Sequence, residues 1–252
     1  MSESLLVTAE IIFNILYLIG IWTLVLFMLR GRDRIQPQDT RTARYFFWAF
    51  FLLAFGDTFH VGSRVIAYLS AQGLELNVNL LGRSFGLVGW SSLVTAITVT
   101  IFYLLLLLAY LARFQKRYTG WISGLFVIGG VRLGLLLLPI NDWNQVVPPQ
   151  PWGTIRNIPL IVVGLAAAFY YLRSAAAEKD REFFWIGIMI LLSYLFYLPV
   201  ILFVQSIPAL GMLMIPKTLA YVAMGIFAVR ALYFRELERV ARVDTVQFES
   251  QG

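Results

Sequence analysis

The 252-residue chain contains no cysteine, and its one histidine is His60. The absence of cysteine excludes disulfides, iron–sulfur ligation and thiolate nucleophiles. A single histidine also excludes bis-histidine haem ligation and any metal site that takes two or more imidazoles from one chain. We therefore predict no metal site, and we assign no catalytic residue from the sequence.

Charge is also scarce, since Asp, Glu, Lys and Arg make up 13% of the residues, about half the usual share in soluble domains. Hydrophobic residues make up 60%. This composition excludes an ordinary soluble globular protein and a disordered one, and it indicates a polytopic membrane protein whose first partners are membrane lipids. The formal net charge is +6, but the basic residues lie between apolar runs and not in one cluster. We therefore expect no nucleic-acid partner.

Long apolar runs dominate the sequence, and about 20 mostly apolar residues are needed for a helix to cross a membrane. Seven runs meet this requirement. They are residues 5–29, 45–70, 85–112, 120–140, 155–172, 183–205 and 209–234. We predict an all-α integral membrane protein with a seven transmembrane helix bundle in residues 1–234. Apolar residues at helical spacing in the following segment predict a cytoplasmic amphipathic tail in residues 235–252.

Most of the 20 basic residues lie in alternate connections of this bundle and in the C-terminal region. They are Arg30, Arg32, Arg34, Arg41, Arg44, Arg113, Lys116, Arg117, Arg173, Lys179, Arg181, Arg230, Arg235, Arg239 and Arg242. The positive-inside rule then places the N-terminus outside and the C-terminus in the cytoplasm. We expect a multi-pass protein of a plasma membrane or a bacterial inner membrane. A cytoplasmic partner that acts in trans is compatible with this topology.

Two connections lie on the opposite side. Residues 141–154 are rich in Pro, Trp and Asn, so they cannot cross lipid with their backbone groups unsatisfied. We expect Trp143 and Trp152 to rest at the membrane interface. The alternative is a lid over an outward-facing pocket. Residues 72–82 are polar and predict no regular element.

Several ionisable residues fall inside the predicted helices, where charges are costly and usually face the bundle interior. Asp57, His60 and Arg64 share one face of the second helix because they stand at positions i, i+3 and i+7. Arg132 and Lys217 lie inside the fourth and seventh helices, and Glu10 lies in the first. Most of this set falls in the outer half of the membrane.

This distribution predicts a polar pocket that opens outward, in which Glu10 and Asp57 balance the basic residues and His60 titrates near neutral pH. The alternative is an ion-pair network that only fixes the register of the helices. We expect the hydroxyl face of the third helix, made of Ser91, Thr95 and Thr98, to serve packing, because hydroxyls in membrane helices commonly do.

The first functional hypothesis is a binding protein, either a receptor or a transporter. Basic residues outnumber acidic ones in the set, which suits the carboxylate or phosphate of a small anionic or amphipathic ligand or lipid. The predicted ligand-binding residues are Glu10, Asp57, His60, Arg64, Arg132, Lys217, Tyr197 and Tyr221.

The second hypothesis is a retinal-type photoreceptor or pump. Seven helices in about 250 residues, an outside N-terminus, an inside C-terminus and a lysine in the last helix resemble the microbial rhodopsin family in outline. The resemblance implies retinal as cofactor, bound to Lys217. Members of that family usually carry an acidic counter-ion in the third helix, where this chain reads GLVGWSSLVTAITVT and has no acid. Asp57 or Glu10 would have to take that place.

The third hypothesis is a membrane-embedded enzyme in which Asp57 and His60 act as an acid/base pair or join Glu10 around a metal. Known seven-helix zinc hydrolases take several histidines from different helices, and this chain has one. We therefore place a binding function ahead of an enzymatic one.

Overall fold

The computed structural model of the chain describes residues 3–80 and 82–234, so the predicted tail 235–252 lies outside the described residues. The helices are α1 (Glu3–Arg30), α2 (Thr40–Leu69), α3 (Leu87–Arg113), α4 (Gly120–Leu136), α5 (Trp152–Ile155), α6 (Ile158–Glu178), α7 (Arg181–Phe203) and α8 (Met214–Tyr233). Six helical segments are long and apolar enough to cross a membrane, α4 is a shorter apolar helix, and α5 is a single turn. The chain is therefore a polytopic membrane protein of the all-α class.

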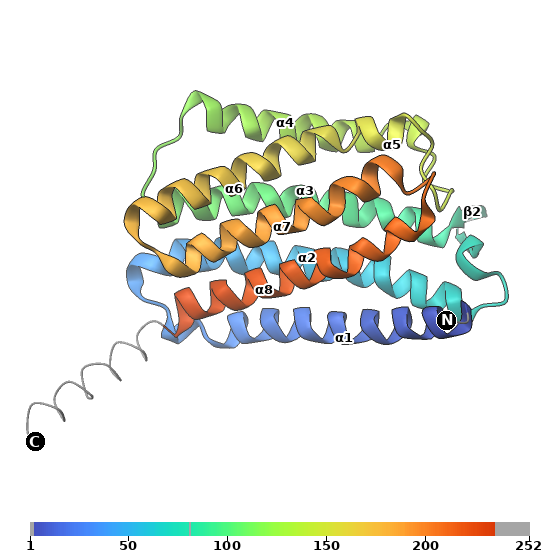
Figure 1. Ribbon diagram of the computed structural model, residues 1–252, viewed down its shortest axis with the longest axis horizontal. Coiled ribbons are helices and arrows are strands. Elements are labelled where there is room, and N and C mark those ends of the chain that lie inside the picture. The colour runs from blue at the N-terminus through green and yellow to red at the C-terminus, as the bar shows by residue number, and fades with distance from the viewer. Residues whose placement is uncertain (1–2, 81, 235–252) are drawn as a thin grey trace, which may run out of the picture.

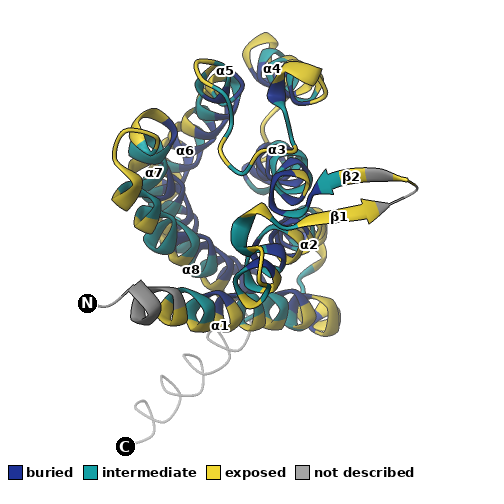
Figure 2. Cartoon of the chain, turned by 90° about the vertical axis from the view of Figure 1, so that its right-hand side faces the viewer, coloured by how far each residue is buried: buried dark blue, intermediate teal, exposed yellow. Residues whose placement is uncertain are grey.

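The long helices lie side by side along one direction (Figure 1). Seen from the end, they form a ring in the order α1, α2, α3, α4, α6, α7 and α8, and α8 returns to contact α1 (Figure 2). Helices that follow one another in the chain are neighbours, as short connections between antiparallel helices require. Contacts of α3 with α6 and of α2 with α8 close the middle of the ring, where buried apolar and aromatic side chains form one core.

The two ends of the bundle differ in chemistry. We call one the hairpin end, because it carries two short strands and residues 139–157. We call the other the basic end, because it carries the Arg30 end of α1, the Arg113 end of α3 and the Arg181 start of α7. The predicted orientation corresponds to the hairpin end outside and the basic end in the cytoplasm.

The strands are a feature that the sequence did not predict. β1 (Asn77–Leu80) pairs with β2 (Arg83–Gly86) in an antiparallel hairpin, with Asn77 opposite Gly86. Gly82 supplies a turn conformation at a φ of +76° that glycine adopts without steric cost. Strands of four residues are too short to show a clear alternation of polar and apolar positions, so the sequence showed only a polar loop here.

α2 and α3 approach each other closely at Gly56. A β-carbon at this position would overlap the hydroxyl oxygen of Thr98 and lie 3.0 Å from the Thr98 β-carbon. The absence of a side chain at Gly56 also lets the Thr95 hydroxyl donate to the Gly56 carbonyl oxygen at 2.7 Å. Small residues and hydroxyls of this kind let membrane helices approach closely, so this contact fixes the spacing of α2 and α3.

We predict that Gly56→Ala lowers the midpoint of thermal unfolding in detergent, because the added methyl group overpacks the α2–α3 contact at a cost of roughly 1–3 kcal/mol. The matched control is Gly62→Ala on the same helix, since a β-carbon there meets no atom within 4 Å. Equal midpoints for the two variants would contradict the close contact.

Candidate functional site

The first polar group of the hairpin end joins α1 and α2. Arg64 Nη2 donates to Glu10 Oε1 at 2.9 Å, and the Tyr68 hydroxyl donates to Glu10 Oε2 at 3.1 Å. The side chains of Arg64 and Glu10 are 29% and 32% exposed. Of the predicted balance of Glu10 and Asp57 against three basic residues, the structure shows the pair of Glu10 with Arg64, whose charges neutralise each other.

The second group is a buried carboxylate on α2. The Tyr17 hydroxyl of α1 donates to Asp57 Oδ2 at 2.5 Å, and both residues are less than a tenth exposed. Burying a carboxylate is unfavourable unless hydrogen bonds or an opposite charge compensate it. The phenol supplies the hydrogen bond, and the charge that acts on Asp57 from another helix is that of Lys217 on α8.

His60 takes part in a line of polar contacts between α2 and α3. Its Nδ1 lies 3.0 Å from the Ser92 hydroxyl, and one turn away the hydroxyls of Ser63 and Ser91 lie 2.6 Å apart. With the contacts at Gly56, these bonds confirm that the hydroxyl face of α3 serves packing. Asp57 and His60 thus hydrogen-bond to different helices, α1 and α3, and no hydrogen bond between them is found in the described part of the chain.

Arg132 is the most deeply buried charge, at 1% exposure on α4. Its guanidinium donates to the Ala96 carbonyl at 2.8 Å, to the Arg156 carbonyl at 3.3 Å, to Asn157 Oδ1 at 3.0 Å and to the Thr100 hydroxyl. We expected an acidic partner, but within the described residues no carboxylate pairs with Arg132. Neutral oxygens satisfy its hydrogen bonds and leave its full positive charge in place.

Arg156 lies near the start of α6 and is 7% exposed. It donates to Asn141 Oδ1 at 3.0 Å, and its guanidinium carbon lies 4.1 Å from the centre of the Trp143 ring. Such a cation–π contact stabilises a desolvated cation by roughly 2 kcal/mol. The sequence places Arg156 among the basic residues at the outer ends of the membrane helices, but it was left out of the predicted ligand-binding set.

Lys217 lies on α8 with its amino group over aromatic rings. Its Nζ is 4.1 Å from the ring centre of Tyr197 and 5.5 Å from that of Tyr221. Among the residues that the structure describes, it makes no hydrogen bond and no ion pair. Asp57 attracts its charge from beyond ion-pair distance, and Arg132 repels it. The three N–H donors of Lys217 are therefore free.

A line of hydroxyl groups leads from Tyr221, whose ring lies near the amino group of Lys217, to the centre of the bundle. The hydroxyls of Tyr221 and Tyr103 lie 3.3 Å apart, and Tyr103 lies 3.3 Å from Ser193 Oγ. No hydrogen bond of the Tyr197 hydroxyl is found among the described residues, and the charges of Arg132 and Arg156 both act on it. Tyr103 and Ser193 escaped sequence analysis because they are ordinary residues of apolar runs.

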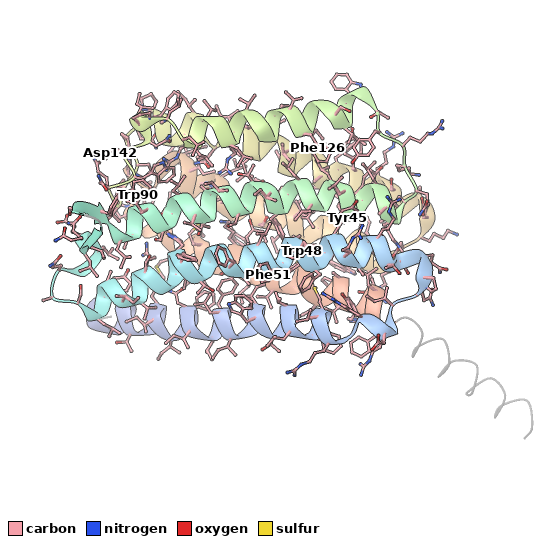
Figure 3. The ribbon with its side chains drawn as sticks, turned by 180° about the vertical axis from the view of Figure 1, so that it is seen from behind. Tyr45, Trp48, Phe51, Trp90, Phe126 and Asp142 are labelled. Carbon is pink, nitrogen blue, oxygen red and sulfur yellow. The ribbon has the colours of Figure 1, made fainter. Side chains whose placement is uncertain are left out.

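The loop of residues 141–154 closes the hairpin end between α3, α4 and α7. Asn144 Oδ1 accepts from the Trp90 indole at 2.8 Å, and the loop backbone packs directly on Gly86 and Gly89 at the start of α3. Figure 3 shows Trp90 and Asp142 at this end. Trp143 turns toward Arg156 and donates its indole N–H to the Leu136 carbonyl at 2.9 Å. The loop is therefore attached to the cation-containing part of the interior through Trp143.

The basic end holds a separate network around Arg113, which sequence analysis used only for orientation. Arg113 Nη1 lies 2.5 Å from Asp39 Oδ1, and its Nη2 lies 2.5 Å from Asp180 Oδ2. These ion pairs join the end of α3 to the segment before α2 and to the turn before α7. A basic residue near a helix end can thus join two connections by ion pairs, in addition to indicating the orientation of the chain in the membrane.

The predicted site residues are therefore divided. Glu10 and Arg64 form a closed pair at the edge, His60 lies in the α2–α3 contact, and Asp57, Lys217 and Arg132 interact electrostatically around the tyrosines. In residues 3–80 and 82–234, no three potential metal-ligating side chains come together. No family model, curated protein or solved structure matches the chain.

Proposed function

We propose that this chain is a seven-helix protein of a plasma membrane or bacterial inner membrane that binds a small anionic or amphipathic ligand beside Lys217, as a receptor or a transporter. The N-terminus would lie outside and the C-terminus in the cytoplasm. The site would open toward the hairpin end, and the loop of residues 141–154 would cover it.

The arrangement of α4 supports the count of seven. Its 17 residues are shorter than a typical crossing helix, but it runs antiparallel to α3 between the two ends of the bundle (Figure 1). Its start follows the Arg113 end of α3, and its last turn lies beside the loop that packs on Gly86 and Gly89. Because its two ends lie at opposite faces of the bundle, this arrangement supports α4 as a seventh crossing helix.

The observation that carries the proposed ligand class is the excess of positive charge in the interior of the hairpin end. Arg132, Arg156 and Lys217 lie in this region, and within the described residues the carboxylate that acts on Lys217 is that of Asp57. Arg132 repels both of the other cations. Because Coulomb interactions are strong away from water, a bound anion relieves this repulsion and gains free energy from each cation.

The free donors indicate which side chains would contact the anion. Lys217 has all its N–H groups available and the Tyr197 hydroxyl lacks a partner, so these two would bind the charged group directly. Arg132 has most of its donors occupied by neutral oxygens, so it would contribute charge rather than contact. The ring of Tyr221 would form an apolar wall for the rest of the ligand.

The topology can be tested with single cysteines, because the chain contains none. We expect a cysteine at Gln115 to react with a membrane-impermeant maleimide only from the cytoplasmic side, and one at Gln145 only from outside. Labelling of both positions from the same side would show that α4 does not cross the membrane.

Ligand binding can be tested with laurate as an amphipathic anion and dodecanol as its uncharged analogue. We expect laurate to raise the midpoint of thermal unfolding, and Lys217→Met to weaken laurate binding roughly tenfold or more, since a hydrogen bond to a charged group contributes about 1.5–3 kcal/mol. Arg64→Met is the matched control, because that cation is already neutralised by Glu10. Equal losses in the two variants, or equal stabilisation by dodecanol, would contradict the proposal.

A second candidate function is retinal binding through a Schiff base on Lys217. One observation favours it: the amine has no ion-pair partner, while Asp57 attracts its charge and Glu10 is already engaged by Arg64. Asp57 rather than Glu10 would then be the counter-ion. No comparable observation favours an enzyme built on Asp57 and His60.

On this second candidate, all-trans-retinal added to the purified protein gives a visible absorption band that is absent in Lys217→Met and shifted in wavelength in Asp57→Asn. A spectrum without a new band eliminates the candidate. That result does not contradict the proposed anion site, because laurate binding does not require the aldehyde group of retinal.

A further inference from the structure

A second region with unpaired positive charge lies at the basic end, at the turn between α6 and α7 (Figure 1). A depression of about 240 Å³ opens here. It is lined by Ala175, Ala176, Lys179, Asp180, Arg181 and Phe184. This volume is many times the space that one water molecule needs, so the depression admits a small polar group.

The turn that forms the rim is well defined by backbone hydrogen bonds. Lys179 has a φ of +55° and ends α6, and Asp180 N donates to the Ala175 carbonyl at 2.9 Å. Asp180 then caps α7, because its Oδ1 accepts from Phe183 N at 3.4 Å. Two adjoining helix ends therefore hold the two cationic residues at fixed backbone positions on either side of Asp180.

The one acidic residue of the lining, Asp180, is ion-paired with Arg113, which also pairs with Asp39. Asp180 Oδ2 accepts two hydrogen bonds from Arg113, at 3.1 Å from Nε and 2.5 Å from Nη2. Its carboxylate is thus engaged with α3 and is 14% exposed. The ion pair with Arg113 weakens the repulsion between the Asp180 carboxylate and an anion that enters the depression.

The cations of the rim are free, in contrast to their neighbours. Lys179 and Arg181 are exposed, and within the described residues their side chains make no ion pair or hydrogen bond. Arg173, also unpaired, lies one turn before Ala176 on the same face of α6. By comparison, Lys116 is paired with Glu178 nearby.

We infer that this depression binds the phosphodiester headgroup of an acidic phospholipid, with Lys179 and Arg181 on the phosphate. Ala175, Ala176 and Phe184 provide an apolar floor at the level where two membrane helices end, which suits the glycerol and the first methylenes of a lipid better than a free ion. Basic pockets between membrane helices on the cytoplasmic side recognise such headgroups. This site is independent of the anion site beside Lys217.

The test is native mass spectrometry of the full chain in detergent, with dioleoyl phosphatidylglycerol or phosphatidylcholine added. We expect tight retention of phosphatidylglycerol and weak retention of phosphatidylcholine. The double variant Lys179→Gln/Arg181→Gln should bind phosphatidylglycerol roughly thirtyfold more weakly, since each cation near a lipid surface contributes about 1 kcal/mol. The matched control is Arg41→Gln/Arg44→Gln, which removes two exposed, unpaired cations from the same end.

Ala176→Leu fills the depression without changing any charge, and we expect it to lower phosphatidylglycerol retention as well. Equal losses in the two double variants would overturn the site, because they would show attraction by surface charge alone. Displacement of the lipid by millimolar inorganic phosphate would also overturn it, in favour of a small-anion site. All side chains replaced in the double variants are exposed, so their folding is checked by an unchanged unfolding midpoint.

Discussion

A positive charge that is held away from water is the constraint on which this bundle depends. Desolvating a cation costs several kcal/mol even after the protein relaxes around it, so each buried basic residue must find oxygen atoms or aromatic faces nearby. Arg132 obtains them from the backbone and side chains of α3 and α6, and Arg156 from Asn141 and Trp143. These partners connect helices that otherwise meet mainly through apolar side chains.

The two ends of the bundle differ in the partners that surround their basic residues. At the basic end, Arg113 lies between two carboxylates, so its positive charge is fully paired and the connections before α2 and α7 are joined. In the interior of the hairpin end, by contrast, the hydrogen bonds of Arg132 and Arg156 are satisfied but their charge is not cancelled, because their partners are neutral. A network of the first kind holds a structure together, whereas one of the second kind retains an attraction for an anion.

The fold was largely predictable because apolar runs report directly on membrane helices. The runs located each long helix, although α6 continues to Glu178 past Arg173, where the predicted run ended, because a charged residue at a membrane surface does not end a helix. The sequence also placed Glu10 and Arg64 in one polar set, but it did not show that these two residues pair with each other. The partners of Arg132 could not be predicted, because two of them are backbone carbonyls, which every residue carries and no sequence pattern marks.

The β-hairpin and the absence of an ion pair at Lys217, within the described residues, could not be predicted from the sequence. Four-residue strands leave too little pattern to detect, and sequence spacing does not tell which of two acids on different helices approaches a given lysine. The Ser/Thr face of α3 was assigned correctly to packing because its spacing repeats along one helix face, and a single helix is enough to define that face.

The loop of residues 141–154 packs on a surface that an earlier part of the chain provides. The loop backbone packs on Gly86 and Gly89, which the ribosome delivers some 50 residues before the loop itself. Because the chain is synthesised from its N-terminus, the surface of α2 and α3 exists before the loop that packs on it. The first half of the chain thus acts as the template on which the second half closes, and a chain begun at α4 would lack the surface that receives its own loop.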